Sequence, residues 1–199
     1  MGLGKEFLNF LISSVFDRNN DKLILGVSFL NHRAIKFYSK CDLSFLDTSL
    51  WFHGPIIVPN SENLFNVRKA TNLDIEEIMS LDFSSIYTQC SKKNISELIK
   101  KPELENLIVE DVNGQVLLFS EIRHLGSYIK LNTLMMKIGS QKVIISDLVK
   151  YLHKKYRKQI KFYLEGRWRN QIEDLMNIGF IIDYKESEIL LVANRMFYP

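Results

Sequence analysis

The chain has 199 residues, of which 46% are hydrophobic and 12% aromatic, so it can build a packed core and is not a disordered chain. The formal net charge is +3, from 26 basic and 23 acidic residues mixed along the sequence, and nucleic acid is therefore not an expected partner. The two cysteines, Cys41 and Cys90, lie far apart and make neither a disulfide framework nor a zinc pattern. We expect a cytoplasmic protein of one or two domains.

Membrane and metal sites are not expected either. No apolar run approaches the roughly 20 residues that a membrane-spanning helix needs, and the first residues lack the features of a signal peptide. The four histidines are scattered, with no neighbouring carboxylate pattern of the kind that binds zinc. The sequence predicts no metal and no membrane contact.

The first fifty residues predict a helix, a strand, a second helix and a further strand or pair of strands. Apolar residues at helical spacing indicate a helix over Lys5–Phe16, and Leu23–Val27 has the length and composition of a strand buried on both faces. Asn31 is a good N-cap for the helix that follows. Leu43–Phe52 predicts one or two strands, broken near Asp47.

Two motifs in this stretch resemble those of the GNAT N-acetyltransferases. One is the pattern Asn31-x-x-Ala34-x-x-Phe37-Tyr38-x-Lys40, which is similar to a cofactor-binding motif of that family. The other is the opening Met1-Gly2-Leu3-Gly4-Lys5, which looks like the end of the family's glycine loop at the start of a helix. Glycines let backbone N–H groups close on a pyrophosphate, and a helix N-terminus adds positive partial charge.

The resemblance implies roles for six residues. Gly2, Leu3, Gly4 and Lys5 would hold the pyrophosphate of an acyl-CoA. Asn31 would bond the pantetheine arm or its neighbours, and Tyr38 would protonate the leaving thiolate as general acid. Acetyl-CoA would be the co-substrate.

The rest of the chain predicts a linker and then a second unit. Residues 54–65 concentrate proline, asparagine and serine, which is typical of a connection. Over residues 66–199 the predicted order is strand, two helices, three antiparallel strands, helix, strand, helix and two strands, with a hairpin turn at Asn113-Gly114. This order resembles a complete GNAT domain. We predict the carboxyl-terminal half of one such domain over residues 1–53 and a full second one over 66–199.

The end of the chain repeats its beginning. Aligning Leu43 with Phe180, an offset of 137 residues, brings helix, strand, helix and strand pair into step. At this offset Tyr38 corresponds to Leu175, and the loop into the second unit's helix has only Gly139 where the family has two glycines. The second unit is therefore predicted to be degenerate and to serve architecture or acceptor binding. Glu121 has two interpretations, a general base that activates an amine or a solvent-facing strand residue, and we favour the second.

The predicted fold is α+β, a mixed sheet of the GNAT type with a partial first copy and a full second copy. The predicted function is transfer of an acetyl group from acetyl-CoA to a primary amine, in a small molecule or a peptide, by direct attack. The alternative is a non-catalytic interaction or acyl-CoA-binding module, or an inactive fragment of a longer tandem acetyltransferase. In that case Met1 is an internal methionine. A half sheet also exposes an unpaired edge, so a homodimer that exchanges strands is a further expectation.

Overall fold

The computed structural model describes residues 2–18, 22–41, 43–54, 65–83, 92–101, 103–137, 144–177 and 179–194. It divides into two compact units. The first combines the residues up to Leu50 with those from Tyr184 onward, and the second runs from Trp51 to Asp183. Most of the predicted linker, residues 55–64, lies outside the described residues. None of the described helices combines the length and the apolar character that a membrane crossing requires.

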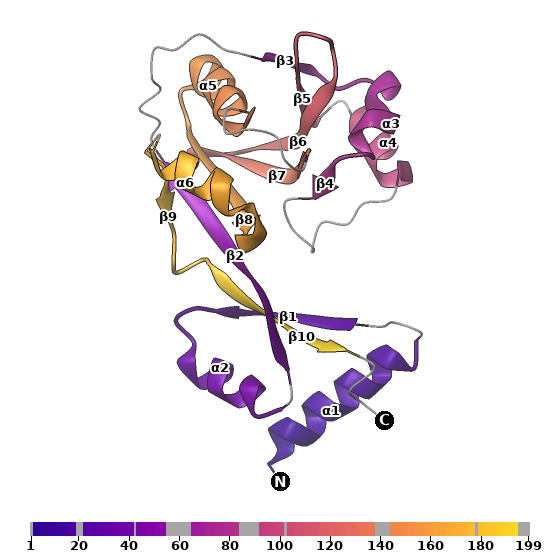
Figure 1. Ribbon diagram of the computed structural model, residues 1–199, viewed down its shortest axis with the longest axis vertical. Coiled ribbons are helices and arrows are strands. Elements are labelled where there is room, and N and C mark those ends of the chain that lie inside the picture. The colour runs from indigo at the N-terminus through magenta and orange to yellow at the C-terminus, as the bar shows by residue number, and fades with distance from the viewer. Residues whose placement is uncertain are drawn as a thin grey trace. The chain divides into compact units, whose positions relative to one another are not determined.

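The first unit is two helices on a three-stranded sheet (Figure 1). Its elements are α1 (Leu3–Phe16), β1 (Lys22–Ser28), α2 (His32–Ser39), β2 (Ser44–Gly54, of which the last residues belong to the second unit) and β10 (Glu188–Asn194). β10 lies between β1 and β2 and is antiparallel to both. The second domain was predicted to run to residue 199. Its last predicted strand is β10, which instead completes the sheet of the first unit.

β1 is the edge strand of this sheet. The prediction that it is buried on both faces is wrong, because Val27 is its only buried residue. An edge strand has a neighbour on one side only, and so the apolar run at Leu23 to Val27 does not identify a central strand.

β2 is a single strand, although the sequence indicated a break near Asp47. The irregularity is a bulge instead. Leu190 pairs with Asp47 and the next residue of β10, Leu191, pairs with Phe45, so Leu46 is the extra residue on β2. A bulge bends and twists a strand without ending it.

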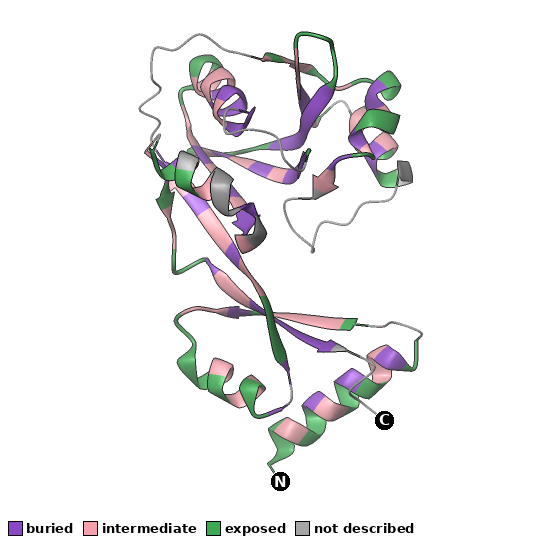
Figure 2. Cartoon of the chain, viewed as in Figure 1, coloured by how far each residue is buried: buried purple, intermediate pink, exposed green. Residues whose placement is uncertain are grey.

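Both helices of the first unit pack on one face of its sheet. In Figure 2 the buried side of α1 is the purple stripe along that helix. The core beneath consists of Leu8, Ile12, Phe16, Val27, Cys41, Leu43, Leu191 and Ala193. Leu8 and Ile12 come from α1 at a spacing of four, as the predicted helical stripe requires.

The second unit is a larger mixed sheet with helices on both faces (Figure 1). Its strands, in chain order, are β3 (Asn66–Lys69), β4 (Asp82–Phe83), β5 (Glu105–Glu110), β6 (Val116–Leu125), β7 (Tyr128–Met136), β8 (Gln159–Glu165) and β9 (Ile181–Ile182). Its helices are the 3-10 helix η1 (Asn72–Asp74), α3 (Ile75–Ile78), α4 (Lys92–Lys100), α5 (Ile144–Tyr156), the 3-10 helix η3 (Gly166–Trp168) and α6 (Arg169–Asn177).

The strands of the second unit follow the order β2-β8-β7-β6-β5-β3, with β4 paired to β7 and β9 paired to the end of β2. β5 and β6 form the predicted hairpin, and Gly114 at its turn has a φ of 80°, which glycine adopts without strain. Among the strand pairs whose direction the structure describes, β7 and β8 are parallel and the others are antiparallel.

Helices cover both faces of the sheet. Side chains on one face, those of Ile108, Phe119 and Met135, pack with Ile78 of α3 and Ile95 of α4. Successive side chains of a strand point to opposite faces, and α5 contacts β3, β5, β6 and β8 on the other face.

Three pairs of elements begin at the offset that was found in the sequence. β1 and β8 begin at Lys22 and Gln159, α2 and α6 at His32 and Arg169, and β2 and β9 at Ser44 and Ile181, each pair 137 residues apart. The strand orders also agree. β10 lies between β1 and β2 in the first unit, and the end of β2 lies between β8 and β9 in the second.

Candidate functional site

The start of α1 is open. Gly2 is the N-cap in an extended conformation, with φ −85° and ψ 146°, and no side-chain hydrogen bond from a described residue caps the helix. The Gly2 carbonyl accepts from the Lys5 N–H at 2.9 Å. A Cβ added to Gly2 would have no neighbour within 4 Å. The first turn of α1 can therefore receive an anion at its backbone N–H groups.

Gly4 belongs to the glycine motif and lies beside Phe37 of the Asn31–Lys40 motif. A Cβ built on Gly4 would lie 3.4 Å from Cζ of Phe37, so the first turn of α1 passes directly against the ring of an α2 residue. The glycine motif and the Asn31–Lys40 motif thus meet in the first unit.

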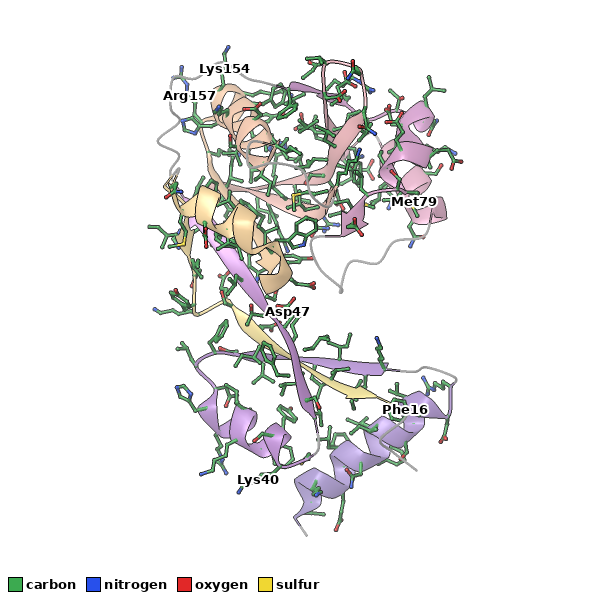
Figure 3. All side chains as sticks on the ribbon, viewed as in Figure 1. Phe16, Lys40, Asp47, Met79, Lys154 and Arg157 are labelled. Atoms are coloured by element: carbon green, nitrogen blue, oxygen red, sulfur yellow. The ribbon has the colours of Figure 1, made fainter. Side chains whose placement is uncertain are left out.

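Asn31 is the N-cap of α2, as predicted. Its Oδ1 accepts from the Ala34 N–H at 3.0 Å. The oxygen has a second lone pair, so a contact between Asn31 and a pantetheine arm would use either Oδ1 as acceptor or Nδ2 as donor. Figure 3 shows α2 ending at the labelled Lys40, its C-cap.

Tyr38 is half-buried and packs against the core of the first unit. Its ring centroid lies 5.3 Å from that of Phe37, with the two rings tilted by 60°. The ring therefore helps to hold α2 on the sheet. The general-acid role of the Tyr38 hydroxyl stays a prediction.

In the second unit, β7 and β8 diverge after a short parallel pairing. These parallel strands pair only from Tyr128 with Gln159 to Lys130 with Lys161, although β7 continues to Met136 and β8 to Glu165. Ligands of such sheets bind at the carboxyl ends of neighbouring parallel strands. Of the loop that leads from β7 into α5, Lys137 is described, and Gly139 lies outside the described residues.

β7 carries a bulge next to this divergence. Ser120 of β6 pairs with Leu134 and Ile122 pairs with Leu131, so β7 holds one residue more than its partner. A bulge turns a backbone group or a side chain out of the regular ladder, and bulges are common beside active sites.

Glu121 lies opposite the bulge, and the prediction that it faces solvent is wrong. Its side chain is 1% exposed. The carboxylate accepts from Asn132 Nδ2 and Thr133 Oγ1, both at 3.1 Å, and from Arg123 Nε at 2.6 Å. These bonds pair a buried charge that would otherwise be costly.

A sequence signal for this burial exists. The segment from Val116 to Ile122 forms the middle strand of three, in a unit with helices predicted around it, and all seven residues are buried. A strand that is covered on both faces buries consecutive residues, because successive side chains point to opposite faces and both faces are packed. A polar residue in such a strand is therefore buried as well.

At the offset of 137 residues Tyr38 corresponds to Leu175, which is 2% exposed and belongs to the core of the second unit. That unit has no hydroxyl at this position of α6, as the sequence predicted. The general acid proposed for the first unit is absent here.

No protein-family model matches the chain, and no curated protein matches it. Solved structures match the chain. A GCN5-related N-acetyltransferase from Sphaerobacter thermophilus aligns with a TM-score of 0.68 at 9% identity, over 98% of this chain and 68% of that one. A GNAT-family acetyltransferase from Colwellia psychrerythraea aligns at 0.55 and 16% identity, over 97% and 73%.

A third similar structure is a tandem GNAT protein from the clavulanic acid biosynthesis pathway, with a TM-score of 0.60 and 8% identity, over 97% of this chain and 70% of that one. At these identities the likeness concerns the fold. The chain has the GNAT N-acetyltransferase fold, an α+β architecture built on a mixed sheet.

Proposed function

We propose that this protein takes part in acetyl transfer from acetyl-CoA to a primary amine. The observation that carries the proposal is the meeting of the open start of α1 with α2, at Gly4 and Phe37. Acyl-CoA binding is the general expectation for a GNAT fold, and these two helices with their N-caps, Gly2 and Asn31, hold the six residues to which the resemblance gives roles.

The reaction is a direct displacement. The neutral amine attacks the thioester carbonyl, a carbon–nitrogen bond forms, and the carbon–sulfur bond breaks. The nitrogen loses a proton to water, and water later restores the Tyr38 hydroxyl. Tyr38 gives its hydroxyl proton to the departing sulfur. Backbone N–H groups of Leu3 and Gly4, with the ammonium of Lys5, neutralise the pyrophosphate.

We extend the proposal to a tandem arrangement of a partial first copy and a complete, degenerate second copy. Three observations support it: the repeated offset of 137 residues, the matching strand orders, and the similarity to a tandem GNAT protein. The second unit then serves architecture or acceptor binding, since Leu175 replaces the phenol.

The second candidate function is a non-catalytic acyl-CoA-binding or interaction module. The observation in its favour is that Tyr38 packs in the core and that no described strand pairs with the outer edge of β1. In this case the chain binds the thioester without transferring its acyl group.

Calorimetric titration with acetyl-CoA tests binding, and release of the CoA thiol in the presence of an amine tests transfer. Lys5→Gln should weaken binding, whereas Lys36→Gln, an exposed lysine on α2, should leave it unchanged. Absence of binding at millimolar acetyl-CoA rejects both acetyl transfer and acyl-CoA binding and selects an interaction module. Binding without amine-dependent thiol release selects the non-catalytic module.

A further inference from the structure

Positive charge is concentrated in one segment of the chain. Residues 123–161 hold ten of the 26 basic residues and one of the 23 acidic residues, Asp147. The small net charge of the whole chain, from which nucleic acid was not expected, conceals this asymmetry. The segment folds into the end of β6, β7, α5 and the start of β8, which are neighbours in the second unit.

Three of these cations lie side by side across the sheet. Arg123 of β6 is opposite Lys130 of β7, and Lys130 is opposite Lys161 of β8. Like charges directly opposite each other on neighbouring strands are destabilising. Glu121 accepts a hydrogen bond from Arg123 Nε at 2.6 Å, but the Arg123 side chain is still 49% exposed. The row therefore retains a repulsion that a bound anion would relieve.

Aromatic rings flank this row on the same face of the sheet. Tyr128 lies two residues before Lys130 on β7, so both side chains point to one face, and Tyr163 lies two residues after Lys161 on β8. Lys161 Nζ is 4.8 Å from the ring centroid of Tyr128. The ring centroid of Trp51 is 5.0 Å from Lys130 Nζ and 5.1 Å from the ring centroid of Tyr163. We call these six residues the basic–aromatic face: Trp51, Arg123, Tyr128, Lys130, Lys161 and Tyr163.

The basic–aromatic face is accessible from solvent. α5 packs on the opposite side of the sheet, whereas α3 and α4 cover this side at its other end, over Phe119 and Met135. Arg123 is exposed, and the other five residues are intermediate between buried and exposed. Lys154 and Arg157, labelled in Figure 3, extend the positive charge to the end of α5 and the turn into β8.

We propose that the basic–aromatic face binds single-stranded nucleic acid, with bases stacked on its three rings and phosphates held by its three cations. Proteins that bind single strands combine positive charge with aromatic side chains on which successive bases stack. A lysine stem is flexible, so each ammonium can leave its ring for a phosphate while a base takes its place. An acidic peptide would use the cations and leave the rings unused, and a duplex keeps its base faces within its own stack. The proposal does not depend on acetyl-CoA binding.

Fluorescence polarisation with labelled oligouridylate and oligothymidylate of about 12 nucleotides tests the proposal. We expect binding that weakens as salt is added. The double variant Lys130→Gln, Lys161→Gln should weaken binding at least about tenfold and reduce the salt slope by about 1.4, since each phosphate contact to a single strand contributes about 0.7. The control is Lys69→Gln, Lys101→Gln, which removes the same charge at exposed positions of the second unit and should change the affinity less than about twofold.

A strand of abasic sugars separates stacking from charge and needs only the unsubstituted protein, in case the double variant fails to fold. It carries the same phosphates and should bind at least about tenfold more weakly than the strand with bases. Trp51→Leu should weaken binding of the strand with bases and leave that of the abasic strand unchanged.

Three results overturn the proposal: equal binding of the two strands, no binding of either oligonucleotide at about 50 mM salt, or an equal loss in the control double variant. Displacement of the strand by polyglutamate at equal charge concentration also overturns it, in favour of an acidic peptide. A preference for oligouridylate or for oligothymidylate supports it and identifies RNA or DNA as the ligand.

Discussion

Gly4 and Phe37 are in contact across two helices, with the ring of Phe37 occupying the space next to the missing Cβ of Gly4. The distance of 3.4 Å from an added Cβ to Cζ is an ordinary van der Waals contact, so a methyl group fits, and a longer side chain directed toward Phe37 would displace its ring. Gly4 therefore sets how closely the start of α1 approaches α2.

A larger side chain at this position should destabilise the first unit. Gly4→Leu pushes the Phe37 ring away and should lower the free energy of unfolding by about 1–3 kcal/mol, measured by urea denaturation. Ser13→Leu, at an exposed position of the same helix, is the control and should be neutral or slightly stabilising, because leucine favours helices. Equal effects of the two substitutions would show that Phe37 moves aside at no cost.

Removal of the Tyr38 hydroxyl should affect chemistry and not folding. Tyr38→Phe keeps the ring that packs beside Phe37, and the thermal midpoint should stay the same. The rate of acetyl transfer should fall about 10²- to 10⁴-fold, with the dissociation constant of acetyl-CoA unchanged. Tyr184→Phe, at an exposed residue of the same unit, should leave the rate unaltered. An unaltered rate for Tyr38→Phe would assign the proton to another donor.

The buried carboxylate of Glu121 should be important for stability. Glu121→Ala leaves Asn132 Nδ2 and Thr133 Oγ1 without their acceptor and should lower the free energy of unfolding by about 2–3 kcal/mol. Glu121→Gln retains an acceptor oxygen and should cost less. Glu103→Ala, at an exposed residue, is the control and should stay within about 0.5 kcal/mol of the parent. A loss no greater than that of the control would contradict the role given to the bulge network.

Glu105 links stability to pH. Burial alone would raise the pKa of this carboxyl, but hydrogen bonds from Lys155 at 2.7 Å, Tyr156 at 2.6 Å and His124 at 3.2 Å outweigh burial and lower the pKa below its ordinary value of 4.5. Because the folded state has the lower pKa, the stabilisation is complete above pH 4.5 and is lost as the pH falls through the folded-state pKa.

The thermal midpoint of the parent should therefore exceed that of Glu105→Gln at pH 6 to 7, and the difference should shrink steadily toward about pH 3. Glu103→Gln provides the matched comparison, with a pH profile that follows the parent. A difference that grows as the pH falls would mean that Glu105 is not held as a paired carboxylate.

The sequence predicted most of the elements because their signals are local. Asn31 caps a helix through its own side chain, Asn113-Gly114 closes a hairpin, and the offset from Leu43 to Phe180 follows from repeated patterns of apolar residues. β4, Asp82–Phe83, was missed because a strand of two residues has no periodicity to detect.

The candidate site was harder to predict because its geometry depends on distant parts of the chain. The motif residues were identified from the sequence, but the approach of Gly4 to Phe37 depends on how two helices pack. The burial of Glu121 depends on strands to either side of it, and the edge position of β1 depends on which strand pairs with it. A local sequence pattern does not specify which distant strands and helices will lie beside it.

The pairing of Lys22 with Asn194 joins two strands across 172 residues of sequence. Until the ribosome has released β10, the nascent chain cannot close the sheet that carries α1 and α2. The sheet of the first unit is thus completed only after the second unit has been translated, and the apolar side chains of the first unit are available to chaperones in the meantime.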